Sequence, residues 1–213
     1  MVVHSPGCSF SAFFLPMSTS PAESPALLAR LRAETRPYHD AVEANPFNRA
    51  LAAGTVTAAD TARFLARMYG VVQPYEQQLR AHAALFGPAW QLDRRYRAHL
   101  ILEDLPLLGY DGTPPLCPPL CPALPPLATW PQLLGAMYVL EGSTLGGQVI
   151  ARQLIKSYIS ANKYFTGRAD QTGPLWKGFC VQLTDAVPTS DHTAIISSAE
   201  QTFQTLATWL SQP

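Results

Sequence analysis

The stretch Glu141-Gly142-Ser143-Thr144-Leu145-Gly146-Gly147-Gln148 places three glycines inside an apolar run, from about Pro131 to Ser160, that otherwise has the pattern of one long helix. Each glycine costs roughly 1 kcal/mol relative to alanine in a helix interior. A helix that keeps three of them needs a bare backbone, against which another surface can lie closely. That surface is either a neighbouring helix or a flat ligand, and this stretch alone gives the two alternatives similar weight.

The rest of the chain repeats the helical pattern. Apolar side chains recur at three- and four-residue spacing, which predicts further helices over about 27–42, 57–86, 90–108, 175–187 and 190–210. Thr57 and Ser190 are expected to act as N-caps, Asp60 to complete a capping box with Thr57, and Gly109 to end the third of these helices. No run alternates with period two for long enough to form a sheet. The sequence therefore predicts an all-α fold, a single-domain bundle of several helices.

Segments without helical pattern set the expected boundaries. Residues 1–24 are rich in Ser, Pro and small side chains and are predicted to be a disordered N-terminal tail, with Met17 a candidate start. The domain is then expected to span residues 25–213. Residues 113–131 hold eight prolines and are predicted to be an extended linker, and residues 162–174 to be a loop.

Composition limits the function classes. The chain has 213 residues, 47% of them hydrophobic, and a formal net charge of zero, which is enough for one well-buried domain. A neutral chain without a basic run is not expected to bind nucleic acid or an anionic membrane surface, and its apolar stretches are too interrupted to span a bilayer. Four cysteines with no disulfide framework predict a cytoplasmic protein, and the spacing of Cys117 and Cys121 disfavours a zinc site.

One of the five histidines stands on an apolar helix face. His39 continues the stripe of the first helix, and Glu43 lies one turn later on the same face. A carboxylate there can accept a hydrogen bond from one imidazole nitrogen and leave the other free to bind a metal. A buried histidine satisfied by its neighbour would have the same pattern, so this helix alone does not decide between the two. A single histidine is a poor site for bare zinc or iron but is sufficient for haem iron, which has four ligands from the macrocycle.

The helix that carries His39 and the helix that carries the glycines offer complementary features for one ligand. One offers an imidazole on an apolar face, and the other offers a bare backbone at Gly142 and Gly146, which lie one turn apart, with Gly147 beside them. A planar ligand of the size of a porphyrin could lie between them. The glycines are a weak match to a phosphate-binding loop, because no strand precedes them and no lysine follows at the required spacing.

Both helices resemble those of the haem oxygenases, most closely the bacterial members associated with phytochrome photoreceptors. Residues 31–43, Leu-Arg-Ala-Glu-Thr-Arg-Pro-Tyr-His-Asp-Ala-Val-Glu, are similar to the proximal helix of that family. Residues 138–148, Tyr-Val-Leu-Glu-Gly-Ser-Thr-Leu-Gly-Gly-Gln, are similar to its distal helix. The order and separation of the two also match, and the resemblance covers about Leu27 to Leu210.

The resemblance implies roles for particular residues. His39 would be the axial ligand of the haem iron, and Glu43 would be its hydrogen-bonding partner. Gly142 and Gly146 would let the distal helix approach the haem face and direct bound oxygen toward one bridging carbon of the ring. The haem propionates are anions that need cations, and the resemblance assigns them two further residues, Arg32 and Lys177.

The implied reaction uses haem as both cofactor and substrate. With O2 and electrons from an external donor, such as a ferredoxin or a reductase, it yields biliverdin, CO and ferrous iron. Resemblance to the phytochrome-linked members implies a bacteriophytochrome as acceptor of the biliverdin.

One position departs from the family pattern and keeps other functions open. Ser143 stands where many haem oxygenases have an Asp that orders water near bound oxygen, and a hydroxyl carries no charge. A haem carrier or sensor on the same fold, without turnover, is therefore the second hypothesis. A third is a helical enzyme with a carboxylate-bridged metal pair or a thiamine-related substrate. It is disfavoured because Glu103 and Asp104 lack a histidine three residues on.

Overall fold

The structure, a computed structural model, describes residues 26–110 and 117–212. These ranges contain helices and no strand, which confirms the all-α prediction. The α-helices are α1 (Leu27–Glu43), α2 (Pro46–Ala52), α3 (Ala58–Ala81), α4 (Ala98–Asp104), α5 (Trp130–Lys156), α6 (Lys163–Thr166), α7 (Thr172–Asp185) and α8 (His192–Leu210). The predicted tail, residues 1–24, with Cys8 and Met17, lies outside the described residues. No helix in the described ranges has both the length and the apolarity needed to cross a membrane.

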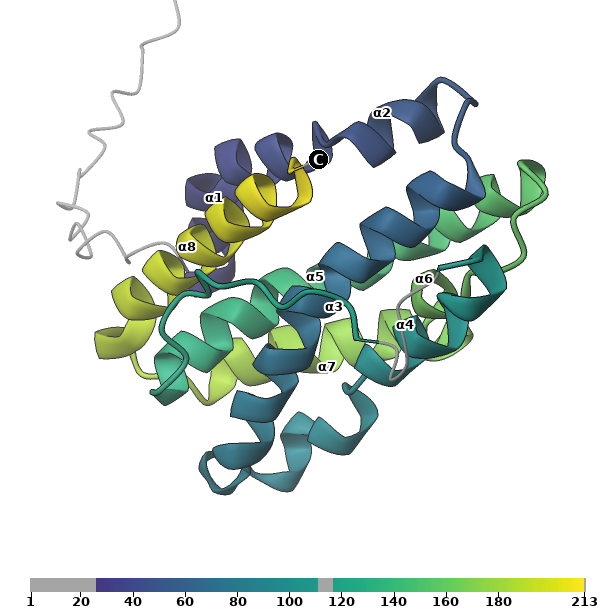
Figure 1. Ribbon diagram of the computed structural model, residues 1–213. Coiled ribbons are helices and arrows are strands. Elements are labelled where there is room, and N and C mark those ends of the chain that lie inside the picture. Colours follow the sequence, from purple (N-terminus) through teal and green to yellow (C-terminus); the bar gives the residue numbers. More distant parts are fainter. Residues whose placement is uncertain (1–25, 111–116, 213) are drawn as a thin grey trace, which may run out of the picture.

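Helix α5 forms the centre of the molecule and packs most extensively on α8, which in turn lies along α1 (Figure 1). A glycine allows this close approach. A Cβ atom at Gly135 would collide with the carbonyl oxygen of Ile195 and would lie 2.6 Å from Cβ of Ser198. The hydroxyl of Ser198 donates to the carbonyl of Gln132 at 2.7 Å and joins the two helices further. The predicted core face of α8 is buried, at Ile195, Ile196, Ala199, Phe203, Leu206 and Leu210.

Helix α3 begins as the sequence predicts. The Thr57 hydroxyl accepts from the backbone N–H of Asp60 at 3.1 Å, and the Asp60 carboxylate accepts from the backbone N–H of Thr57 at 3.0 Å. This reciprocal pair is a capping box. The helix ends at Ala81 rather than at Phe86, and a short 3₁₀ turn follows over Ala83–Leu85.

The prediction of one helix over about 90–108 is wrong. The segment contains α4 and three short 3₁₀ turns, Pro88–Trp90, Leu92–Arg94 and Pro106–Leu108. Gln91 takes the left-handed conformation, with φ 49°, and Gly109 does so after the last turn, as expected for a residue that ends a helix. The helix is interrupted because Arg95 and Arg97 turn inward toward α5. Arg95 pairs with Glu141 at 2.5 Å, and Arg97 donates to the carbonyl of Leu140 at 2.9 Å. These contacts outweigh the local helical pattern.

Several smaller elements also differ from the prediction. Helix α2 was not expected, although Asn45 caps it and Pro46 occupies its first turn. The predicted loop over 162–174 contains α6, because the buried Asp104 accepts from the backbone N–H groups of Lys163 and Tyr164 at 3.1 and 2.9 Å. Helix α7 starts at Thr172 and ends at Asp185. Ser190 lies inside a 3₁₀ turn, Thr189–Asp191, and does not cap α8.

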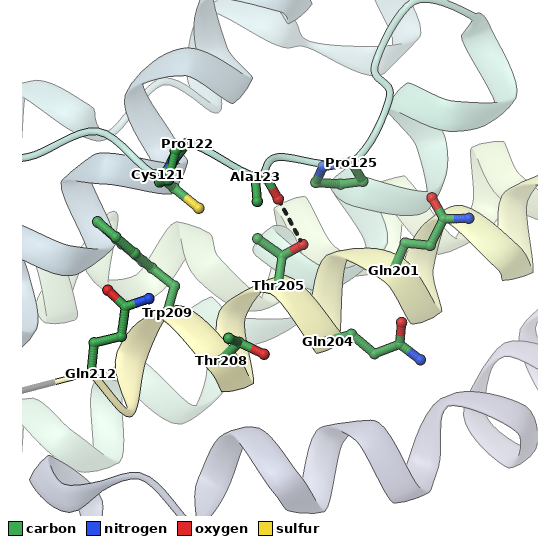
Figure 2. Close-up of a pocket in the computed structure, with 10 residues that line it drawn as sticks. All are labelled: Cys121, Pro122, Ala123, Pro125, Gln201, Gln204, Thr205, Thr208, Trp209 and Gln212. Atoms are coloured by element: carbon green, nitrogen blue, oxygen red, sulfur yellow. Dashed lines mark hydrogen bonds between the residues drawn. The ribbon is translucent and has the colours of Figure 1, made fainter.

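The described part of the proline-rich segment, from residue 117, crosses α3 and α8. The backbone N–H of Cys121 donates to the carbonyl of Gly70 at 3.0 Å, and the hydroxyl of Thr205 donates to the carbonyl of Ala123 at 3.4 Å. Figure 2 shows the groove of about 350 Å³ between this segment and α8. Its lining residues are prolines and uncharged side chains, with Cys121 at one end, so it offers no set of groups for metal or acid–base chemistry.

Candidate functional site

A second cavity, of about 270 Å³, lies between α1 and α5 and reaches α3, α6 and α8. Small-molecule sites typically have volumes of about 300–1,000 Å³, so this cavity is slightly smaller than that range. Most of its wall is apolar, with contributions from Phe64, Met68, Ile150, Phe165, Phe203 and Leu206. His39 and Glu43 of α1 and Gly142, Ser143 and Gly146 of α5 line the same cavity. The tertiary structure thus brings these five residues, and Gly147 beside them, into one site.

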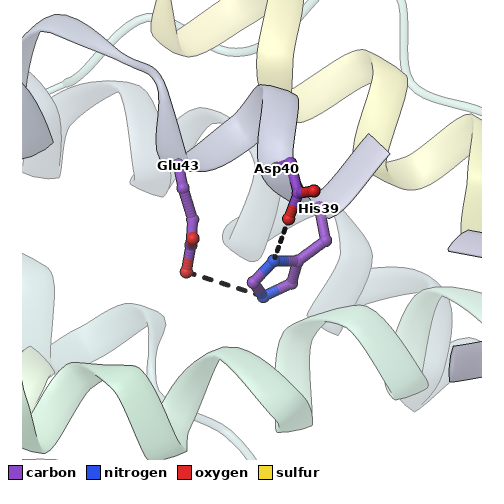
Figure 3. A group of neighbouring side chains, drawn as sticks. All are labelled: His39, Asp40 and Glu43. Carbon is purple, nitrogen blue, oxygen red and sulfur yellow. Dashed lines mark ion pairs between the residues drawn. The ribbon is translucent and has the colours of Figure 1, made fainter. Parts of the chain in front are cut away.

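His39 projects from α1 between two carboxylates. Its Nδ1 lies 3.8 Å from an oxygen of Asp40, and its Nε2 lies 3.8 Å from an oxygen of Glu43 (Figure 3). Both distances are too long for a hydrogen bond. About half of the His39 side chain is exposed, at 52%, and its ring meets Phe203 edge-on, with centroids 5.7 Å apart. The imidazole is therefore held on one side by an aromatic ring and keeps both nitrogens available.

Asp40 is a neighbour of His39 that the sequence reasoning missed. The ligand atoms of His39, Asp40 and Glu43 lie within 4.8 Å of one another, and all three residues are exposed. A metal ion held by His39 would therefore lie close to two carboxylates. The adjacency of Asp40 in the sequence was a visible signal, but its direction relative to the imidazole depends on the side-chain conformation.

The three glycines in the 141–148 stretch of α5 have different surroundings. A Cβ atom at Gly146 would have no heavy atom within 4 Å, and one at Gly142 would lie at ordinary contact distance, 3.6 Å, from the Trp176 ring. A Cβ at Gly147 would lie 2.8 Å from the carbonyl oxygen of Phe165. Close helix packing therefore explains Gly147, while Gly142 and Gly146 leave α5 bare on its cavity side. Both alternatives raised by the sequence apply, each to different glycines.

The hydroxyl of Ser143 is engaged with its own helix. It donates to the carbonyl of Leu140 at 2.7 Å, and the hydroxyl of Thr144 donates to the carbonyl of Glu141 at 2.6 Å. Ser143 lines the cavity, but in this conformation its proton is directed to the backbone. The oxygen remains able to accept a hydrogen bond from a ligand or a water molecule.

Arg32 and Lys177 are exposed and do not line the cavity. Arg32 lies close enough to Tyr138, which does line it, to act on its ionisation. Burial raises the pKa of Tyr138, while a hydrogen bond involving Thr35 and the charge of Arg32 oppose that rise. Arg32 likewise opposes the rise that burial produces in the pKa of the Cys180 thiol on α7. Arg32 lies on α1, which packs against α7, the helix that carries Lys177.

Two buried polar residues that line the cavity, Arg97 and Tyr164, were not predicted. Arg97 is 6% exposed and lies over the ring of Tyr164, with its guanidinium carbon 5.0 Å from the ring centroid. The hydroxyl of Tyr164 is buried without a hydrogen-bond partner among the described residues. Burial raises its pKa, and the phenol is neutral at physiological pH. The sequence prediction missed both residues because it assigned Arg97 to a helix and Tyr164 to a loop.

Comparison with known proteins decides the family. No family model matches the chain. The chain is 35% identical over 137 residues to a haem oxygenase of Xanthomonas campestris pv. campestris, a match that covers 62% of this chain and 76% of that protein. The chain belongs to the haem oxygenase family. This membership removes the ground for the third hypothesis, a metal-pair or thiamine-related enzyme.

Solved haem oxygenases share the fold of this family member. The structure from Leptospira interrogans superimposes with a TM-score of 0.73 at 20% identity and covers 87% of this chain and 98% of that one. Haem oxygenase-1 from the cyanobacterium Synechocystis, solved in complex with haem, gives a TM-score of 0.69 at 17% identity and covers 87% and 90%. At these identities the likeness concerns the fold, and the roles of individual residues rest on the geometry of the site.

Proposed function

We propose that the chain is a haem oxygenase in activity as well as in family, and that the cavity between α1 and α5 binds haem as its substrate. The observation that carries the proposal is the pairing of one accessible imidazole, His39, with a bare helix backbone at Gly142 and Gly146 in one cavity. An apolar wall, a single nitrogen ligand and an open glycine surface fit a flat apolar macrocycle that already supplies four ligands to its metal.

The proposed products are biliverdin, CO and ferrous iron, formed with O2 and electrons from an external donor such as a ferredoxin or a reductase. Bound haem would supply the oxygen-activating iron. His39 would hold that iron through one nitrogen, and Glu43 or Asp40 would orient the ring after a small side-chain rotation from the observed 3.8 Å separations. The bare backbone at Gly142 and Gly146 would leave space for oxygen between α5 and the ring.

Arg32 and Lys177 are proposed to pair with the haem propionates. Arg32 and Lys177 are exposed cations on α1 and α7, two helices that pack against each other. We also propose a cytoplasmic location, in keeping with the free thiols of Cys117, Cys121 and Cys180, and a bacteriophytochrome as the acceptor of biliverdin.

The first experiment replaces the proposed ligand. Purified protein is mixed with haem and its absorption spectrum is recorded for the native chain, for His39→Ala and for the control His99→Ala. The native chain and His99→Ala, whose histidine lies exposed on α4, should show the spectrum of histidine-ligated haem. His39→Ala should lose it. An unchanged spectrum in His39→Ala would refute the assignment.

A haem carrier or sensor remains the second candidate, because the Ser143 hydroxyl is uncharged and donates to the backbone carbonyl of Leu140. The haem complex is supplied with O2 and an electron donor, and its pigment is identified. Biliverdin and released iron would establish the enzyme. A complex that persists under these conditions would establish the carrier.

A further inference from the structure

Beside α5, a narrow crevice of about 10 Å³ is lined by four arginines, Arg94, Arg95, Arg97 and Arg168. Glu141 is the one carboxylate that lines it. Arg95 and Arg97 are 5% and 6% exposed, so two of the four guanidinium groups are removed from solvent. Such a concentration of cations is unusual in a chain whose formal net charge is zero.

The Glu141 carboxylate already forms an ion pair with one of these arginines. Glu141 pairs with Arg95 at 2.5 Å, and both side chains are buried. Among the described residues, no carboxylate lies within 4.0 Å of the guanidinium of Arg94, Arg97 or Arg168. Arg97 and Arg168 donate to the carbonyls of Leu140 and Tyr96, and Arg94 donates to two glutamine side chains. Neutral acceptors satisfy donors but leave the charge uncompensated, and buried cations are normally paired with an anion.

The cations also act on one another. The pKa of Arg168 is lowered by burial, and the charges of Arg94, Arg97 and Arg95 lower it further, against the opposing effect of Glu141. The first turn of α7, which contributes Thr172 and Leu175 to the crevice, has no acidic residue and no side-chain cap. The positive end of a helix dipole therefore adds to the same field.

We propose that this arginine crevice is a binding site for a small inorganic anion of the size of chloride. Four cations with a single, already paired carboxylate favour an anion. At about 10 Å³ the crevice is at the lower limit of the roughly 10–15 Å³ that hold one water molecule. Chloride is larger than water, so its binding would require a small outward movement of the exposed Arg94 side chain, and a phosphate group would require a larger one.

The site would be connected to the larger cavity through Arg97. Arg97 lines both the crevice and the larger cavity, where its guanidinium lies over the Tyr164 ring. An anion in the crevice would compensate a buried positive charge that borders the cavity. Occupation of the crevice would therefore change the electrostatic environment in which a ligand of the cavity lies.

Thermal unfolding of the full, haem-free chain tests the proposal without reference to catalysis. The unfolding temperature is measured in sodium chloride and in sodium gluconate at equal ionic strength, which keeps screening the same while gluconate is too large for the crevice. Chloride should raise the unfolding temperature by about 2–4 °C when it is several-fold above its dissociation constant. In Arg168→Gln the chloride effect should disappear, while in gluconate this variant should be at least as stable as the native chain, because a repelling charge is gone.

Matched variants separate the crevice from general charge effects. Arg152→Gln makes the same charge change at an exposed position on α5, outside the crevice, and should keep the full chloride effect. Arg94→Gln, at an exposed lining position, provides a second test should Arg168→Gln fold poorly. Equal unfolding temperatures in the two salts, an undiminished chloride effect in the Arg168 and Arg94 variants, or a larger effect from phosphate than from chloride would each overturn the proposal. Because haem is absent throughout, failure here would leave the proposed function untouched.

Discussion

Gly146 and Gly147 are sequence neighbours on α5, yet the space beside each Cα differs completely. The position of a Cβ at Gly146 is empty to 4 Å, whereas at Gly147 it is 2.8 Å from a backbone oxygen of α6. A helix turns by about 100° per residue, so consecutive positions face different neighbours. One glycine therefore keeps a cavity open, and the other allows two helices to touch.

Substituting each glycine by alanine should separate these roles. Gly146→Ala should stabilise the fold by up to about 1 kcal/mol, since alanine is the better helix former, but should weaken haem binding because its methyl group enters the cavity. Gly147→Ala should destabilise the fold by about 1–3 kcal/mol, because the Phe165 backbone cannot move away easily. Urea unfolding and haem titration measure the two effects. A loss of stability in Gly146→Ala would contradict the assignment of open space beside it.

At the scale of a single element, the local sequence specifies where α3 begins. The capping box uses groups three residues apart, so no distant contact is needed to form it. The side-chain hydrogen bond from Thr57 lowers the pKa of the Asp60 carboxyl below its usual 3.8. Burial opposes this shift, and the backbone hydrogen bond of Thr57 and the charge of Arg63 add to it.

Thr57→Ala should destabilise the protein by about 1 kcal/mol at neutral pH. The loss should shrink on acidification. Because the pKa of Asp60 is lower in the folded state, the unfolded chain binds its proton first, and the contribution of the ionised cap falls as pH drops below about 4. Denaturant unfolding of both proteins at neutral and acidic pH measures this. A cost that stayed constant down to pH 2 would show that the ionised carboxylate of Asp60 takes no part in the cap.

At the scale of the whole molecule, buried polar groups join segments that lie far apart in the sequence. Glu141 on α5 pairs with Arg95, and Glu76 on α3 accepts from the backbone N–H groups of Arg97 and Ala98 at the start of α4. Asp104 at the end of α4 does the same for the start of α6. These contacts connect elements separated by tens of residues, and they fix the segment before α4 in its irregular path.

Removing one partner of the buried pair should therefore be costly. Glu141→Gln leaves the guanidinium of Arg95 buried with no opposite charge and should cost about 3–5 kcal/mol of unfolding free energy. Glu103→Gln breaks the pair with Lys163, which is 2.7 Å long with both side chains about half exposed, and should cost far less because solvent screens an exposed pair. Urea unfolding compares the two. Similar losses in both variants would mean that burial does not set the strength of the Glu141 pair.

The local pattern of apolar residues was sufficient to predict the long helices. The three- and four-residue spacing of apolar side chains predicts α1, α3, α5 and α8, because a helix that packs on a core must present one apolar face. The buried residues of α8 agree with that spacing one by one. The same pattern failed over 90–108, where Arg95 and Arg97 have no local reason to leave a helix and their partners, Glu141 and the carbonyl of Leu140, lie on α5.

The amino-acid sequence by itself determined the all-α class, the two helices that face each other across the cavity, and the family to which their motifs belong. Tertiary structure alone decided which glycines face open space and which touch a neighbouring backbone, and it alone gathered four arginines at one crevice. Hydrophobic periodicity is a local property that a sequence displays directly. Space beside a Cα atom and the distance between charges depend on which segments fold against each other, and only the packed molecule defines them.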